Sequence, residues 1–533
     1  MSKAERRWCL AFSGVLAIVT TVPYLWALTQ EGEAWRFSGF LFGVEDGNSY
    51  IAKMLAGSHG AWLFRTPYTT VPQTGILAFL PYLLLGKLAA GPALHEQLLA
   101  LYHGARVLAI PIGVTVTYAF ASRFLEEPRS RQWATFLGTV GGGLGWLIPL
   151  AGRSTLYGSL PLEFYSPETF GFLATLGLPH LVVARALLLT ALGWYLDAVQ
   201  RDARTAWAAV ALLGLGLFQP LAVVSAWVVI GFHVVLEAWR GEQGRAALLA
   251  RMRVAAGVIG LSSPIVLYYG FLGIVDPFVR EWTAQNIIRS PHPIHYVLAY
   301  GLFAAVAVWG VARARPRGSH LVLIGWLLAL PVLAYAPVDL QRRLPDGIWV
   351  AMVILAVAAV RQWSGWPGHW AIIGLAALSL PSSLLLIVGG LRTAATPSIP
   401  AFVPAEAVAA YRALSDSAEP GEAVLTSFQT GNVLPAWAPV RVPMGHGPES
   451  IRLRDIRPRV EAFFRAETND SERRSLLAEH EIRFVLIGPS ERLLGTWNAD
   501  AADYLTEVFS SGGFHVYVVN DLYGCDCGSG RGG

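Results

Sequence analysis

Long apolar runs separated by charged connectors constrain this chain more than any other feature. Runs of about 18 to 22 residues recur along the 533-residue sequence, and each is long enough to cross ~30 Å of hydrocarbon. Only 14% of the residues are charged, whereas a soluble domain carries about a quarter. We therefore expect a mainly α-helical, polytopic transmembrane bundle of about eleven spans. The predicted spans are residues 8–29, 98–122, 133–150, 180–199, 205–219, 221–239, 254–274, 295–312, 320–337, 347–363 and 370–390.

Basic connectors orient these spans, because short cytoplasmic loops are enriched in Lys and Arg. If the apolar stretch 74–90 does not cross, the basic N-terminus and all the basic connectors fall on one side. These connectors are residues 126–131, 201–204, 240–253 and 313–318. If 74–90 does cross, four of them fall outside. We therefore predict that 74–90 is a juxtamembrane helix on the outer surface, with the N-terminus cytoplasmic and the C-terminus extracytoplasmic.

This orientation defines a transmembrane domain over residues 1–395 with four outer loops. The loops are predicted at residues 30–97, 151–179, 275–294 and 339–347. Lysine occurs only at Lys3, Lys53 and Lys87, and the other basic residues are arginines. Such usage is typical of GC-rich coding, so we expect a multi-pass protein of a bacterial inner membrane.

After Gly390 the composition becomes that of an ordinary soluble domain, predicted over residues 400–523. Alternating strand and helix patterns indicate a small extracytoplasmic α/β domain. The predicted strands are 423–427, 440–444, 483–488 and 514–519, and the predicted helices are 404–415, 453–466, 470–480 and 500–509. Residues 524–533, with Cys525 and Cys527, are expected to be a disordered tail.

Two acids in the outer loops are candidate catalytic residues. Asp46 lies in EDGNSY just after the first span, where it can serve as a general base or a metal ligand. The alternative is a turn, since Asp-Gly and Gly-Asn form turns. Glu168 lies in FYSPETFGF of the second outer loop. Its alternative is a helix N-terminal residue stabilised by the helix dipole.

Basic residues near the outer face are candidate substrate-binding groups. Arg106 and Arg185 lie inside apolar spans, where arginine is costly and marks function unless it snorkels. His180 lies at the mouth of the span that holds Arg185. Arg342 and Arg343 face outside, against the charge rule, and guanidinium groups match phosphate oxygens. Contact with lipid headgroups is the alternative for these two.

Two segments of the soluble domain also combine glycine with polar residues. They are TSFQTGNVLPAW at 426–437 and MGHGPES at 444–450, which holds His446 and Glu449. Glycines allow a close backbone approach to a ligand, but tight turns need them as well. The sequence leaves both interpretations open.

The whole plan resembles the GT-C superfamily of membrane glycosyltransferases, which use sugars carried on polyprenyl phosphate or pyrophosphate. EDGNSYIAKMLAGSHGAW at 45–62 is similar to the family's first-loop acidic motif, which implies that Asp46 is the catalytic or metal-binding acid. YTTVPQTGILAFLPYLLLGKLA at 68–89, followed by Arg106, resembles the juxtamembrane segment and the next span. The resemblance further implies that Glu168 is the second-loop acid and that Arg342 and Arg343 hold the donor phosphate. The first motif departs from the family in having Glu-Asp-Gly, and the second loop has no clear Asp-x-Asp.

These observations predict an inverting glycosyltransferase that moves a sugar from a polyprenyl-phosphate donor to an extracytoplasmic acceptor. The acceptor class is a lipid, glycan or protein, membrane lipids are the surroundings, and no nucleic acid is expected. The metal ligands are unknown, and Mg²⁺ or Mn²⁺ is a candidate cofactor. We expect Asp46, Glu168 and the 342–343 turn to face one cavity. The alternatives are a lipid or solute transporter, which would have pseudo-symmetric halves, and a non-catalytic assembly protein on the same frame.

Overall fold

The structure is a computed structural model that describes residues 1–201, 204–241, 244–362 and 366–520. Its contacts divide the chain into two compact units. The first contains Met1–Trp26, Tyr102–Arg280 and Asn286–Ala395, and the second contains Ala27–Leu101, Glu281–Gln285 and the chain from Thr396. Residues 30–97, the predicted first outer loop, thus share a unit with the C-terminal segment. The expected tail 524–533 lies outside the described residues.

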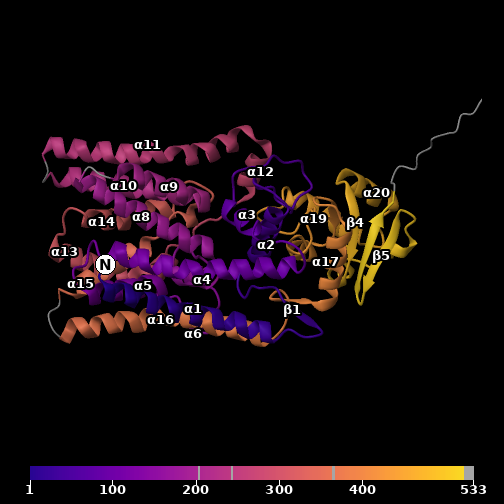
Figure 1. Ribbon diagram of the computed structural model, residues 1–533, viewed down its shortest axis with the longest axis horizontal. Coiled ribbons are helices and arrows are strands. Elements are labelled where there is room, and N and C mark those ends of the chain that lie inside the picture. Colours follow the sequence, from indigo (N-terminus) through magenta and orange to yellow (C-terminus); the bar gives the residue numbers. More distant parts are fainter. Residues whose placement is uncertain (202–203, 242–243, 363–365, 521–533) are drawn as a thin grey trace, which may run out of the picture. The chain divides into compact units, whose positions relative to one another are not determined.

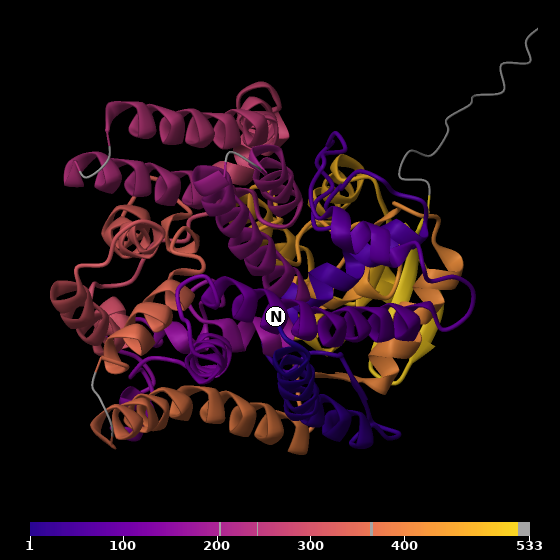
Figure 2. The same ribbon diagram turned by 60° about the vertical axis from the view of Figure 1, so that its left-hand side comes forward.

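Apolar helices make up almost all of the first unit (Figure 1). Their bounds are α1 Lys3–Thr29, α4 Leu94–Ala121, α5 Pro128–Val140, α6 Leu147–Leu150, α7 Gly171–Gly177, α8 Pro179–Arg201, α9 Thr205–Phe218, α10 Pro220–Arg240, α11 Arg245–Val275, α13 Ile294–Ala314, α14 His320–Ala334, α15 Ile348–Val360 and α16 Trp366–Ala395. Helices α1 and α4 extend into the second unit, at residues 27–29 and 94–101. Helices α10 and α11 run side by side in both views (Figures 1 and 2). Within the described residues, eight helices are long and apolar enough to cross a membrane, and α9 and α14 are shorter apolar helices. The prediction of a polytopic helical bundle is confirmed.

The prediction that residues 133–150 form one continuous helix is wrong. Helix α5 ends at Val140, because Gly141 is extended and the chain leaves the helix through three consecutive glycines. The released backbone bonds to neighbouring helices, with the Gly142 amide donating to the Ser379 carbonyl at 2.8 Å. A side chain at Gly143 would collide with the backbone of Ala299. Close backbone packing, which apolarity does not encode, ends the helix here.

The stretch 74–90 contains only the seven-residue helix α3, Leu80–Gly86, with a proline near its start. Seven residues rise about 10 Å, so α3 is too short to cross a bilayer. Helix α3 packs against α2, Val44–Ser58, where Gly57 and Gly86 bring the two backbones into contact. A Cβ atom at either glycine would strike the other helix. This packing fixes the helix that carries Asp46.

The second unit also holds two sheets and several short helices. A two-stranded sheet pairs β1, Trp35–Phe37, with β2, Phe402–Pro404, and the other sheet has the order β3-β4-β6-β5. Those strands are β3 Ala423–Leu425, β4 Ile482–Ile487, β6 Phe514–Val519 and β5 Leu505–Ser511. The helices are α17 Ala405–Ser417, α18 Phe428–Val433, α19 Leu453–Phe463, α20 Asp470–Glu479 and α21 Pro489–Arg492, together with α12, Pro277–Gln285, whose residues divide between the units. The predicted small α/β domain is confirmed.

Two element predictions in this domain are wrong. Residues 500–509 were expected to be helical, but β5 occupies 505–511 and pairs antiparallel with β6. Gly512 and Gly513 make the tight turn between them, with Gly512 at φ +54°, and a Gly-Gly pair between two strands is a hairpin signal. Residues 440–444 form no strand, because Arg441 makes only an isolated bridge to Ala423 and the Val442 amide donates to the Pro67 carbonyl instead.

Candidate active site

Asp46 lies on the first turn of α2 and points its carboxylate at a histidine 400 residues further along the chain. Nε2 of His446 lies 3.0 Å from Oδ1 of Asp46. The Asp46 side chain is 57% exposed, whereas His446 is buried. The acid is therefore accessible on one side and held in place on the other.

His446 lies between two carboxylates. Its Nδ1 is 3.3 Å from Oε1 of Glu449, and its ring packs 5.5 Å from that of Tyr68. Burial disfavours the charged imidazolium, but the hydrogen bond to Asp46 and the nearby Glu449 outweigh it and raise the pKa of His446 to about 9. The imidazole is therefore charged at neutral pH, with a positive ring between two negative groups.

Glu449 joins this histidine to a buried lysine. Its Oε1 lies 2.6 Å from Nζ of Lys53, and their side chains are 3% and 1% exposed. Ser49 and Thr66 donate to the same carboxylate at 2.8 and 2.7 Å. Burial alone would raise the pKa of Glu449, but Lys53 and His446 lower it well below its usual range. We call Asp46, His446, Glu449 and Lys53 the Asp46 cluster.

The ammonium group of Lys53 is enclosed by aromatic rings as well. It lies 4.2 Å from the ring centroid of Phe79 and 5.2 Å from that of Phe64, distances at which a cation and a ring attract each other. An ammonium buried at this depth needs such partners, because desolvation of an unpaired charge is costly. Lys53 is therefore a buried structural residue, and its ammonium group is held by Glu449 and the aromatic rings.

The segment 426–437 also contacts α2, through Asn432. Asn48 donates to the side-chain oxygen of Asn432 at 2.8 Å, and Asn432 donates to the Glu45 carbonyl at 3.2 Å. A Cβ atom at Gly431 would strike the Met444 carbonyl, so glycine permits the 426–437 and 444–450 segments to touch. The two glycine-containing segments thus meet at the first turn of α2, and the glycines serve close packing.

A second polar cluster joins the candidate residues of the first unit. Arg343 lies 3.4 Å from Glu168, and Arg185 pairs with Asp346 at 3.0 Å. Arg185 also donates to the carbonyls of Pro167 and Glu168, at 2.9 and 3.0 Å. Four charged side chains from the segments 151–179 and 339–347 and from α8 are thus connected.

Arg342 and Arg343 differ in their surroundings. The guanidinium of Arg342 lies over the Tyr165 ring, 4.5 Å from its centroid, whereas Arg343 is 44% exposed. Their short helix, η2, spans Gln341–Arg343. Arg343 is therefore the arginine that a ligand reaches more readily.

Arg106 and His180 are the two remaining candidate substrate-binding residues, and they lie on α4 and α8. Arg106 is buried on α4 and donates to Thr20 at 3.1 Å and to Thr21 at 2.9 Å, both on α1. Its guanidinium also lies 4.8 Å from the ring centroid of Tyr24. These contacts stabilise helix packing. His180 is half-buried on the first turn of α8, and its role as a substrate group stays a prediction.

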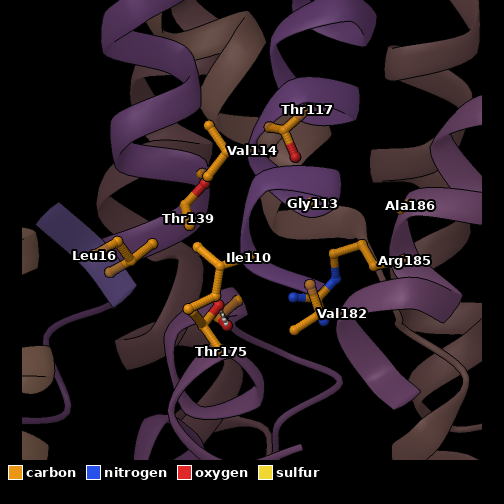
Figure 3. Close-up of a pocket in the computed structure, with 12 residues that line it drawn as sticks. Leu16, Ile110, Gly113, Val114, Thr117, Thr139, Thr175, Val182, Arg185 and Ala186 are labelled. Carbon is orange, nitrogen blue, oxygen red and sulfur yellow. Dashed lines mark hydrogen bonds between the residues drawn. The ribbon is translucent and has the colours of Figure 1, made fainter. Parts of the chain in front are cut away.

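A small cavity adjoins Arg185 (Figure 3). Its volume is about 30 Å³, room for about one or two water molecules and too little for a sugar ring. Figure 3 shows Arg185 among the lining residues, most of which are apolar or threonine. The cavity is therefore too small to be a substrate site.

Sequence reasoning missed Asp346, Lys53 and the role of His446. Asp346 precedes Gly347 at the mouth of an apolar helix, where a charge is costly, and that signal could have found it. Lys53 stands out as one of three lysines in the chain. The sequence singled out His446 only as a polar residue of a glycine-containing segment, and no local sequence pattern connects it with Asp46.

The Asp46 cluster does not form a metal-binding site. The two carboxylates lie on opposite nitrogens of His446, so they do not converge on one point. Within the described parts of the chain, no three His, Cys, Asp or Glu side chains are grouped as metal ligands. The four residues of the Asp46 cluster therefore do not form a binding site for a divalent cation.

Similar proteins are found by structure and not by sequence. No protein-family model matches the chain, and no curated protein matches it. The oligosaccharyltransferase AglB of Archaeoglobus fulgidus aligns over 96% of this chain and 75% of its own, with a TM-score of 0.57 and 12% identity. ArnT of Cupriavidus metallidurans, in a structure bound to undecaprenyl phosphate, aligns over 97% and 99%, with a TM-score of 0.53 and 14% identity.

A third similar structure is the mycobacterial arabinofuranosyltransferase AftD. It aligns over 98% of this chain but only 42% of its own, with a TM-score of 0.55 and 15% identity. All three alignments span nearly the whole chain, helical unit and C-terminal domain together. The chain therefore has the GT-C fold, the fold of the membrane glycosyltransferases that the sequence resembles.

Proposed function

We propose that this chain is an integral membrane glycosyltransferase that moves a sugar from a polyprenyl-phosphate donor to an extracytoplasmic acceptor. The observation that carries the proposal is the exposed carboxylate of Asp46, held by His446. The GT-C fold supports it, and solved structures of that fold contain undecaprenyl phosphate in ArnT and dolichol phosphate in AglB.

Asp46 is the group we assign to the acceptor. Its carboxylate accepts the proton of an acceptor hydroxyl while that oxygen bonds to the anomeric carbon of the donor. The bond between the anomeric carbon and the phosphate oxygen breaks, and its electron pair leaves with the polyprenyl phosphate. Attack opposite the leaving group inverts the anomeric configuration. Glu168, which pairs with Arg343, is assigned a supporting role.

Arg343 is the group we assign to the leaving phosphate. A guanidinium offers two parallel N–H donors to phosphate oxygens and stabilises the charge that develops when the bond breaks. Arg342, whose guanidinium lies 4.5 Å from the centroid of the Tyr165 ring, is the second arginine that we assign to this role. Arg185 is already paired with Asp346, so we assign it to the support of the loop that holds Arg343.

Replacing Arg343 by alanine is expected to weaken donor binding and to lower turnover. Loss of a charge-assisted contact is worth about 1.5–3 kcal/mol, which corresponds to a rise of roughly 10- to 100-fold in KM for the donor. Steady-state transfer in membranes with varied donor concentration measures this change. The matched control is Arg441→Ala, an arginine of the C-terminal domain, for which KM should not change. An unchanged KM in Arg343→Ala would remove Arg343 from the donor site.

The orientation of the chain in the membrane is part of the proposal. Single cysteines near residue 315 are expected to be labelled only from the cytoplasm, and cysteines near residue 450 only from outside. Labelling of intact cells with an impermeant thiol reagent, before and after lysis, measures this. Labelling with the sides exchanged would place Asp46 in the cytoplasm and exclude the proposed acceptor side.

A further inference from the structure

His446 holds the side chain on which the proposed chemistry depends. It is buried, its Nε2 lies 3.0 Å from Oδ1 of Asp46, and Asp46 itself is exposed. An exposed carboxylate with no such anchor samples several rotamers, whereas an N–H donor fixed at one oxygen selects one of them. The histidine thus restricts the direction in which the acid points.

His446 is itself held from three directions. Ser450 accepts from the backbone amides of Gly445 and His446, at 3.0 and 3.2 Å. Glu449 lies beside Nδ1, and the ion pair with Lys53 fixes Glu449 to α2. The ring of Tyr68 packs against the imidazole, and the Tyr68 hydroxyl donates to the Asn432 carbonyl at 3.1 Å. A side chain so constrained can transmit its position to Asp46.

We infer that His446 is a positioning residue for Asp46, supplied by the C-terminal segment and held by Glu449 and Lys53. The inference rests on the proposed function, because it gives His446 its role through the acid. The Nε2–H group of His446 directs the Asp46 carboxylate toward the acceptor hydroxyl. The C-terminal segment thereby contributes to turnover without touching the reacting atoms.

Two conservative substitutions separate this role from simple packing. In His446→Gln the amide nitrogen lies near the position of Nε2, whereas in His446→Asn it lies near the position of Nδ1. Both variants keep a neutral amide side chain, and they differ in how far that amide reaches. The kcat of transfer should fall about 10- to 100-fold in the Asn variant, since misplacement of a reacting group by about 1 Å costs up to ~10². The Gln variant should keep most of the wild-type kcat, and KM for the donor should change little in both.

A double-mutant cycle with Asp46→Asn gives the second readout. If His446 acts through Asp46, then His446→Asn should lower the residual rate of Asp46→Asn no further. His515→Asn is the matched control, because His515 also pairs with a carboxylate, at 2.6 Å from Glu507, but lies on β6. This control should leave kcat unchanged.

The outcomes separate the inference from the proposed function. If the wild-type protein transfers no sugar, the proposed function is wrong. If Asp46→Asn transfers sugar at the wild-type rate, the assignment of Asp46 as the general base is wrong, and the inference about His446 falls with it. If Asp46→Asn is inactive while His446→Asn keeps the wild-type kcat, only the inference is overturned. Equal losses in the Gln and Asn variants, or an additive loss in the double variant, would also overturn it, because either result shows that a donor at the position of Nε2 is not what acts on Asp46.

Discussion

Asp46→Asn is expected to fold normally and to lower sugar transfer by ~10²- to 10⁴-fold, the usual cost of losing a general base. Asparagine keeps the size of the side chain and can still bond to His446, but its amide cannot take up the proton of an acceptor hydroxyl. Because the side chain is 57% exposed, the substitution leaves no buried cavity. Transfer from lipid-linked sugars in membranes, together with the melting temperature of the purified protein, measures both parts.

The control for this variant is Glu45→Gln. Glu45 is the neighbouring exposed acid on the same turn of α2, so its change removes one negative charge at nearly the same place. Wild-type transfer in Glu45→Gln and loss in Asp46→Asn would assign the effect to one carboxylate. Equal losses would indicate a general effect of negative charge on this turn of α2, which contradicts a specific role for Asp46.

Glu449→Gln is expected to destabilise the second unit by about 3–5 kcal/mol, the cost of leaving one member of a buried ion pair without its partner. The Lys53 ammonium would remain buried beside a neutral amide. Hydrogen exchange of the amides in 44–58 and 444–450 measures the local loss, which is suitable because a chain of two units need not unfold in one step. The double variant Lys53→Met with Glu449→Gln should recover much of the loss.

An exposed ion pair, between an arginine and a glutamate, provides the comparison. Arg459 and Glu479 lie 2.5 Å apart but are 46% and 51% exposed, so Glu479→Gln should cost less than about 1 kcal/mol. Similar protection in Glu449→Gln and in the wild type would show that the Lys53 pair does not hold α2 to the 444–450 segment.

The same exchange measurement should depend on pH. The raised pKa of His446 gives stability that is fully present below about pH 6.5 and is lost as the pH rises through about 9. The lowered pKa of Glu449 gives stability that is present above about pH 4.5 and is lost on acidification below that value. Protection of 444–450 should therefore be greatest between about pH 5 and 6.5.

The sequence predicted the helical spans because lipid leaves few solutions for a long apolar run. It failed at 133–150, where three glycines admit a neighbouring backbone, and at 500–509, where polar residues on an edge strand look helical. The candidate acids and Arg342 and Arg343 were found because charge is rare in this chain. The contacts of Asp46 with His446 and of Lys53 with Glu449 join residues about 400 positions apart. No local pattern encodes such a pair, so only the folded chain reveals it.

The central claim is that the chain transfers a sugar from a lipid phosphate. The most direct test incubates the purified protein in vesicles with polyprenyl-phosphate sugars of several kinds, labelled in the sugar, and follows the label. We expect at least one donor to be consumed and its label to move to an acceptor, and we expect Asp46→Asn to bind this donor without consuming it. Failure to consume any donor, with a labelled lipid or solute crossing the vesicle membrane instead, would contradict the proposed sugar transfer and identify a transporter.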